Sequence, residues 1–280
     1  MANEIATQQQ PQQTLQQLMN SGAVMKKLND VLGSEKKAAS FVSSVISVAN
    51  GNSYLRNCNP MTILGSAMVA ATLDLPIVPT LGLAYIVPYK GQCQFQLGYK
   101  GLIELAERSG QFKNIIDEVV YDGQLVRKNR FTGEYEFDED ARLRDASGKP
   151  TEKVIGYMAR MDLINGFSKT IFWTKEEVEA HANKFSQAFR AKKGTPWVSD
   201  FDAMARKTIL KALFAKYAPK SVAIQNAIKF DQAVVKPNEV LTEEDLQIDY
   251  DIEYADNEQI QEAVEEEVAP NGDLFNENQK

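Results

Sequence analysis

The sequence predicts an α+β fold, with a small antiparallel sheet built of hairpins and packed against several helices. Three observations predict it. Amphipathic helical patterns with capping residues flank a central region, that region holds short segments of alternating apolar residues, and turn dipeptides join neighbouring segments. The turns are Lys90-Gly91 and Asn165-Gly166, the second being the strongest hairpin signal in the chain. Strands flanked by runs of helices are typical of the α+β class.

The first 110 residues are predicted to form four helices and one hairpin. Gly33 ends the first helix and Ser34 caps the second, and Asn59-Pro60 is a capping residue followed by proline at the first helical position. The predicted elements are helices over 14–32, 35–49 and 60–73, hairpin strands over 83–88 and 92–97, and a helix over 99–109.

The next 120 residues continue with strands and then helices. Residues 113–140 are predicted to be strands and charged loops, and Thr174 and Glu177 form a capping box. Pro219 ends the long helix that precedes it. The predicted elements are strands over 153–163 and 169–173 and helices over 175–189, 200–217 and 221–231.

The charge of the 280-residue chain changes sign near its C-terminus. Residues 1–236 hold 30 Lys and Arg against 23 Asp and Glu, a net charge of +7, whereas residues 237–280 hold 15 acids and one base, a net charge of −14. We therefore expect a disordered Gln-rich N-terminus over 1–13, one basic domain over 14–236 and a disordered acidic tail over 237–280. A basic body is compatible with binding to DNA or RNA.

Several classes of chemistry have no motif in this sequence. It contains no GxxxxGK[ST] loop for a nucleoside triphosphate, and its single histidine, His181, is expected to be a packed or surface residue. Cys58 and Cys93 form no CxxC pair, which favours a reducing compartment over a disulfide or zinc scaffold. No segment resembles a signal peptide or a membrane span, so we expect a cytoplasmic protein. Because these catalytic motifs are missing, we do not expect an enzyme.

A cluster of acids offers an alternative function. Its members could hold Mg²⁺ in a nuclease, but acids on alternating faces of a strand do not converge on one ion, so a solvated loop is the favoured interpretation. The cluster comprises Glu134, Glu136, Asp138, Glu139 and Asp140.

Two segments before residue 131 combine cations with aromatic or amide side chains. The first could grip sugar-phosphate and stack bases, or could be an ordinary hairpin surface; its candidates are Tyr85, Gln94, Gln96, Tyr99 and Lys100. The second is Arg127-Lys128-Asn129-Arg130, which lies close to Tyr121 and Phe131 in sequence. These cations could bind nucleic acid or could simply be solvated, and the sequence leaves both interpretations open.

Two helices add further candidate cations. Arg108 follows Glu104 by four residues, so an ion pair within the helix competes with binding. Lys207 and Lys211 share one face of the helix over 200–217. Arg206 falls within the apolar stripe of that helix, where it needs either a protein carboxylate or a ligand phosphate.

A set of short segments follows a specific order and spacing along the chain. These are Cys58-Asn59-Pro60, Leu75-Pro76, Gly82-Leu83-Ala84-Tyr85-Ile86-Val87-Pro88-Tyr89, residues 96–110 (QLGYKGLIELAERSG), residues 197–202 (WVSDFD), Met204-Ala205-Arg206-Lys207-Thr208 and Pro219-Lys220-Ser221. In combination, order and spacing they resemble the RecT family of phage recombinases, in a version from a phage of Gram-positive bacteria. The resemblance covers roughly residues 20–235.

The resemblance implies an ATP-independent protein that anneals complementary single strands of DNA. It implies a fold distantly similar to lambda Red Beta, a homo-oligomeric filament or ring that holds the annealed duplex, and two partners, a RecE-type 5′→3′ exonuclease and the host single-strand-binding protein. No cofactor is expected, and any help from Mg²⁺ would act through the DNA. A protein-interaction module with a basic face is a further alternative.

Annealing without sequence preference requires contacts to phosphates that leave the base edges free. The residues expected to contact phosphate are Lys100, Arg108, Arg127, Lys128, Arg206, Lys207 and Lys211. The residues expected to form the strand surface are Tyr85, Gln94, Gln96 and Tyr99. The acidic tail is left with three interpretations: a linker, a hook for a protein partner, or a mimic of DNA.

Overall fold

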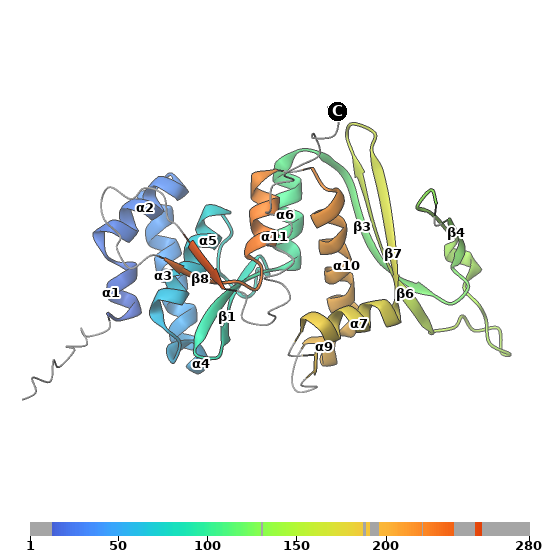
Figure 1. Cartoon of the computed structure of the whole chain (residues 1–280), viewed down its shortest axis with the longest axis horizontal. Helices are drawn as coiled ribbons and strands as arrows, with labels where there is room; N and C mark the ends of the chain where they lie inside the picture. Colours follow the sequence, from blue (N-terminus) through green and yellow to red (C-terminus); the bar gives the residue numbers. More distant parts are fainter. Residues whose placement is uncertain are drawn as a thin grey trace, which may run out of the picture. The chain divides into compact units, whose positions relative to one another are not determined.

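A computed structural model describes residues 13–129, 131–186, 189–190, 196–219, 221–237 and 250–253 (Figure 1). Its contacts divide the described residues into two units. The first contains the residues up to Gly101 together with the segment from Lys229 to Glu253, and the second contains the residues from Leu102 to Ile228. The chain returns to its first unit at Lys229, and the single basic domain expected over 14–236 spans both units and stays a prediction.

Five helices form the N-terminal part of the first unit. They are α1 (Leu15–Met19), α2 (Gly22–Leu32), α3 (Glu35–Gly51), α4 (Ser53–Arg56) and α5 (Pro60–Thr72). The single helix expected over 14–32 is broken, because the Ser21 side chain accepts a hydrogen bond from Val24 N at 3.4 Å and starts a new helix. Gly33, with φ of 68°, ends α2 as expected.

Helix α5 forms the centre of this unit. The Asn59 side chain accepts a hydrogen bond from Met61 N at 3.0 Å, and Pro60 occupies the first turn, so the predicted helix start is confirmed. Ten of its 13 residues are buried, which fits its apolar and small side chains. Strands β1, β2 and β8 all pack against it.

The first unit also contains four strands. β1 (Ala84–Tyr89) and β2 (Gln92–Leu97) form the expected antiparallel hairpin, whose turn has positive φ at Lys90 and Gly91. β8 (Val234–Pro237) pairs with β9 (Tyr250–Glu253). The segment before β8 is joined to β2, because Phe95 N donates to Ala233 O at 3.2 Å and Leu97 N donates to the buried Asp231 carboxylate at 2.8 Å.

Two strands near the C-terminus, β8 and β9, were not predicted from the sequence. β8 was not predicted, and β9 lies within the segment expected to be a disordered tail. Backbone pairing explains both, because a short strand gains its hydrogen bonds from a neighbour that sequence periodicity does not reveal. The rest of the acidic tail and residues 1–12 lie outside the described residues.

The second unit is built on a three-stranded antiparallel sheet in the order β3-β6-β7 (Figure 1). Helices α7 and α10 pack against this sheet, and a separate hairpin, β4–β5, follows β3. The elements are α6 (Tyr99–Ser109, which begins in the first unit), β3 (Phe112–Tyr121), β4 (Leu125–Asn129), β5 (Glu134–Phe137), the 3₁₀ turn η1 (Glu139–Ala141), β6 (Val154–Leu163), β7 (Ser168–Thr174), α7 (Lys175–Phe185), α9 (Pro196–Ser199), α10 (Phe201–Tyr217) and α11 (Val222–Phe230).

One face of the long sheet and the apolar stripe of α10 form the core of this unit. Tyr157, Ala159 and Met161 alternate along β6 and are buried, as predicted, and Leu213 and Phe214 of α10 are buried as well. The mixture of helices with small antiparallel sheets confirms the predicted α+β class. None of the helices among the described residues is long and apolar enough to cross a membrane.

Candidate nucleic-acid interface

The predicted binding residues are distributed over both units. The first unit contains Tyr85, Gln94, Gln96, Tyr99 and Lys100, and the second contains Arg108, Arg127, Lys128, Arg206, Lys207 and Lys211.

In the first unit, the Tyr85 hydroxyl and the Lys100 side chain meet at Gly82. A Cβ atom at Gly82 would lie 3.3 Å from the Tyr85 hydroxyl oxygen and 3.5 Å from Cδ of Lys100. Gln96 lies directly opposite Tyr85 across the hairpin, so both project from the same face. A cation, a phenol and an amide that were separate in the sequence are thus neighbours. Lys100 is exposed and forms no ion pair with another described residue.

Glycines create this arrangement. Gly98 N donates a hydrogen bond to Leu83 O at 2.9 Å, and a Cβ atom at Gly98 would collide with the backbone of Gly82. A Cβ atom at Gly101 would likewise collide with Leu83 O. The first turn of α6 can therefore lie directly against the segment that leads into β1. This close backbone packing holds Tyr99 and Lys100 beside the hairpin.

Gln94 differs from the exposed strand surface expected from its sequence context. Its side chain is only 5% exposed, and its Nε2 atom has no hydrogen-bond partner among the described residues. Gln96 and Tyr85 are half-buried. The β1–β2 hairpin therefore exposes fewer polar side chains than its sequence predicted.

In the second unit, Arg206 is held by a buried carboxylate. Its Nε donates to Asp117 Oδ2 at 2.7 Å, and its Nη2 donates to Asp117 O at 2.8 Å. Asp117 on β3 is buried, whereas the Arg206 side chain is 38% exposed. Of the two anions that the sequence left open for Arg206, the structure contains the protein carboxylate.

Arg108 also has an anionic neighbour within the chain. Its Nε lies 3.5 Å from Glu104 Oε1 one turn earlier in α6, which is the competing interpretation raised from the sequence. The Glu104 carboxylate offsets the positive charge of Arg108 locally and competes with a phosphate for it.

Lys207 and Lys211 lie one turn apart on α10 and are half-buried. Lys211 is close enough to His181 to affect its titration. Burial is the main reason that the pKa of His181 falls from 6.5 to about 4, and the charges of Lys211 and Lys184 lower that pKa further. The centre of the His181 ring lies 5.2 Å from that of Trp173 and 4.5 Å from that of Phe185, so of the two expected environments, packed or surface, the structure has the packed one.

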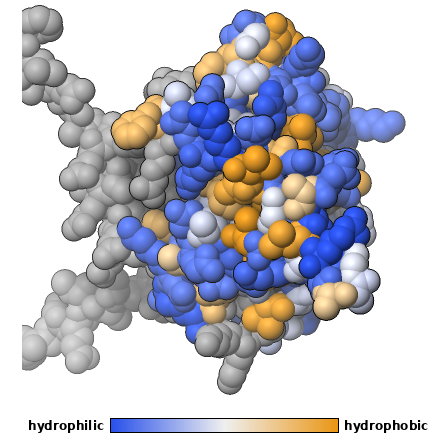
Figure 2. Space-filling model, turned by 90° about the vertical axis from the view of Figure 1, so that its right-hand side faces the viewer, coloured by the Kyte–Doolittle hydropathy of each residue, from blue (hydrophilic) through white to orange (hydrophobic). Residues whose placement is uncertain are grey.

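The β4–β5 hairpin carries Arg127 and Lys128, both exposed. Lys128 lies directly opposite Tyr135, and its Nζ is 5.7 Å from the centre of the Tyr135 ring and 5.9 Å from that of Phe172. Arg127 lies opposite Glu136 on the other face. Figure 2, which looks at the side of Figure 1 that carries β4, shows separate hydrophobic groups within a mostly hydrophilic surface.

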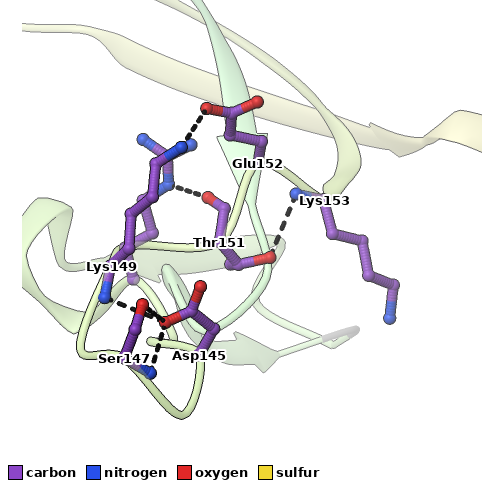
Figure 3. A network of polar contacts seen from close by, with 7 residues as sticks. Asp145, Ser147, Lys149, Thr151, Glu152 and Lys153 are labelled. Atoms are coloured by element: carbon purple, nitrogen blue, oxygen red, sulfur yellow. Dashed lines mark hydrogen bonds and ion pairs between the residues drawn. The ribbon is translucent and has the colours of Figure 1, made fainter.

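The lysines of the connection between β5 and β6 form ion pairs, and Figure 3 shows the pair of Lys149 with Glu152. Lys149 Nζ lies 3.5 Å from Glu152, and Lys153 Nζ lies 2.9 Å from Asp122. The Asp145 carboxylate accepts hydrogen bonds from the backbone and hydroxyl of Ser147, which lowers its pKa. These paired lysines are therefore suitable controls for Lys100 and Arg127, which form no ion pair with another described residue.

The acidic cluster considered for a nuclease is spread along β5 and η1. Glu134 and Glu136 project from one face of β5, whereas Asp138 caps η1 by accepting a hydrogen bond from Asp140 N at 2.9 Å. Within the described part of the chain, no three His, Cys, Asp or Glu residues are arranged to hold a metal ion.

Comparison with known proteins places this chain in context. A family model described as the RecT family matches residues 39–251. The chain is 47% identical over 220 residues to the uncharacterized protein YqaK of Bacillus subtilis, covering 79% of this chain and 72% of YqaK. It is 30% identical over 187 residues to Protein RecT of Escherichia coli, covering 64% of this chain and 65% of that protein.

The α+β architecture and these matches define a protein of the class that anneals single strands in DNA recombination. The chain belongs to the RecT family, as its motifs in the segments 58–110 and 197–221 indicated. Membership of this family implies binding to single-stranded DNA and assembly into oligomers.

Proposed function

We propose that this protein anneals complementary single strands of DNA without ATP, by binding phosphates in any sequence and holding the new duplex in a homo-oligomer. The observation that carries the proposal is the meeting of Tyr85 and Lys100 at Gly82, with Gln96 on the same face. This group combines a phenol and an amide with a cation that forms no ion pair among the described residues, and none of the three requires a particular base.

Charge distribution explains how such a protein could promote annealing. Two single strands repel each other through their phosphates, and lysine or arginine side chains that neutralise those phosphates reduce the repulsion. Lys100 and Arg127 are the best candidates, because neither forms an ion pair with another described residue. Arg206 and Arg108 are weaker candidates for phosphate binding, because each forms an ion pair with an acid of this chain.

The cellular setting of the proposal follows from the family. We propose a cytoplasmic phage protein that acts after a RecE-type 5′→3′ exonuclease has exposed single strands covered by the host single-strand-binding protein. No cofactor takes part in the proposed reaction, and any Mg²⁺ would act by screening the DNA.

Mixing two complementary oligonucleotides with the purified protein tests the proposal. One strand carries a fluorophore and the other a quencher, and no nucleotide is present. We expect quenching much faster than without protein, and oligomers on the DNA in electron micrographs. No acceleration at low salt, or an absolute need for ATP, would overturn the proposal.

The same mixture distinguishes the nuclease alternative. With Mg²⁺ present, an end-labelled strand is analysed on a denaturing gel. Unshortened strands that become duplex support annealing, whereas progressive shortening that is lost in a Glu134→Gln, Glu136→Gln variant would assign the function to the acids of β5.

A further inference from the structure

We propose that Phe131, at the turn of the β4–β5 hairpin, stacks on a nucleobase of bound single-stranded DNA. This inference rests on the proposed function and adds to it a base contact, whereas Arg127 of the same hairpin is proposed above to contact phosphate. Phe131 is 102% exposed, the highest value among the exposed large apolar residues of the described chain.

Hydrogen bonds among its described residues brace the turn that carries Phe131. The Asn129 side chain accepts hydrogen bonds from Phe131 N at 3.0 Å and Thr132 N at 3.2 Å. Gly133, with φ of 70°, donates its N–H to Asn129 O at 2.9 Å, and the Thr132 hydroxyl donates to Glu134 at 2.9 Å. An aromatic ring on an ordered turn loses little conformational entropy when it binds.

Two lysines lie close to this hairpin, Lys169 at the turn and Lys128 on β4. A Cβ atom at Gly133 would lie 2.8 Å from Nζ of Lys169, so the ammonium group is in contact with the turn. Lys128 shares a face with Tyr135, while Glu134 and Glu136 share the other face. The acids are therefore separated from Lys128 by the hairpin backbone.

An exposed aromatic residue next to cations is suited to binding single-stranded DNA, which offers both bases and phosphates. The ring can stack on any base because every base has a π-face, and the lysines can contact the phosphates on either side. A lone exposed apolar residue is common on protein surfaces and needs no explanation by itself. The combination of full exposure, an ordered turn and adjacent lysines is what points to a nucleobase.

Fluorescence and binding measurements on Phe131 variants test this inference. Phe131→Trp should bind oligo-dT as well as the wild type, and its added fluorescence should be quenched on binding. Phe131→Ala and Phe131→Leu should both bind roughly 5- to 100-fold more weakly, since neither retains an aromatic face. Because Phe131 is fully exposed, these variants lose no packing in the monomer.

Two controls isolate stacking from other causes. An oligomer of abasic sites retains the phosphates, so wild type and Phe131→Ala should bind it equally and Phe131→Trp should show no added quenching. Tyr54→Trp places an exposed tryptophan on α4, where Tyr54 is 75% exposed, and its fluorescence should not change with base content.

The outcomes separate this inference from the proposed function. If Phe131→Ala binds and anneals oligo-dT and its complement like the wild type, the stacking role is wrong while annealing stands. Phe131→Leu could instead bind and anneal like the wild type while Phe131→Ala changes the sedimentation of the DNA-free protein. That result would make Phe131 a contact between protomers and the stacking role wrong. If the wild type binds no single strands, both proposals are wrong.

Discussion

Arg206 on α10 and Asp117 on β3 are joined by two hydrogen bonds of 2.7 and 2.8 Å, through the carboxylate and the backbone carbonyl of the aspartate. The residues are 89 positions apart, so this pair fixes the long helix to the central sheet of its unit. The carboxylate is buried, and its charge needs the guanidinium beside it. The arginine that the sequence made a candidate for phosphate binding is thus also a structural residue.

Replacing one partner of this pair should destabilise the second unit. We expect Arg206→Ala to lower the free energy of unfolding by about 2–3 kcal/mol, because it leaves the Asp117 charge buried without its partner. Arg206→Lys should lose less, and the double variant Arg206→Met, Asp117→Leu should recover part of the loss. Urea unfolding measures all three. If Arg206→Ala is as stable as the wild type and its DNA binding depends less steeply on salt, the structural role is wrong and Arg206 contacts phosphate.

Lys100 should contribute one phosphate contact. Lys100→Ala should weaken binding to all single-stranded sequences alike and reduce the slope of log K against log salt by about 0.7. Lys149→Ala is the matched control, because Lys149 is exposed but paired with Glu152, and its slope should not change. Fluorescence anisotropy at several salt concentrations provides the slopes. A loss limited to certain sequences would argue against a phosphate contact.

Gly98 should tolerate no side chain. A Cβ atom there would collide with the Gly82 backbone, so we expect Gly98→Ala to cost about 3 kcal/mol or more in unfolding free energy and to displace Lys100. Gly51→Ala, at the end of α3, has open space around it and should be nearly neutral. Thermal unfolding measures the stability of Gly98→Ala and Gly51→Ala. Equal stabilities of the two variants would show that the backbone at Gly82 can move to make room for the added Cβ atom.

His181 should make the fold less stable in acid. Its folded pKa of about 4 lies below the ordinary value of 6.5, so between these pH values the unfolded chain binds the proton more readily. Stability is therefore complete above pH 6.5 and decreases as the pH falls towards 4. With allowance for partial exposure we expect a loss of about 1 kcal/mol between pH 7 and pH 5. His181→Gln should lose less over the same range in urea unfolding; an identical loss would assign the effect to other groups.

Deletion of the acidic tail should preserve annealing. A chain ending at Glu253 keeps β9, whereas one ending at Pro237 loses the strand that pairs with β8. We expect both to anneal DNA in vitro, and only the shorter one to lose stability, because the backbone groups of β8 lose their partner strand. Annealing rates and unfolding curves of the two truncated chains test this. Failure of both to anneal would make the tail part of the annealing machinery.

Local patterns in the sequence determined most of the elements correctly. Asn59-Pro60, the capping box at Thr174 and the turn at Asn165-Gly166 all act within a few residues, so their effects can be predicted without the fold. The alternation along β6 likewise identified its buried face. The motifs in the segments 58–110 and 197–221 were sufficient to indicate the RecT family.

Only the tertiary structure decided what the charged and polar residues do. Sequence periodicity could place Arg206 within an apolar stripe, but it could not bring Asp117 to it from another element. In the same way, the meeting of Tyr85 with Lys100, the burial of Gln94 and the pairing of β8 with β9 depend on contacts between distant parts of the chain. The physical reason is that capping and periodicity are local, whereas the partner of a charge or of a strand edge is set by how the chain folds back on itself.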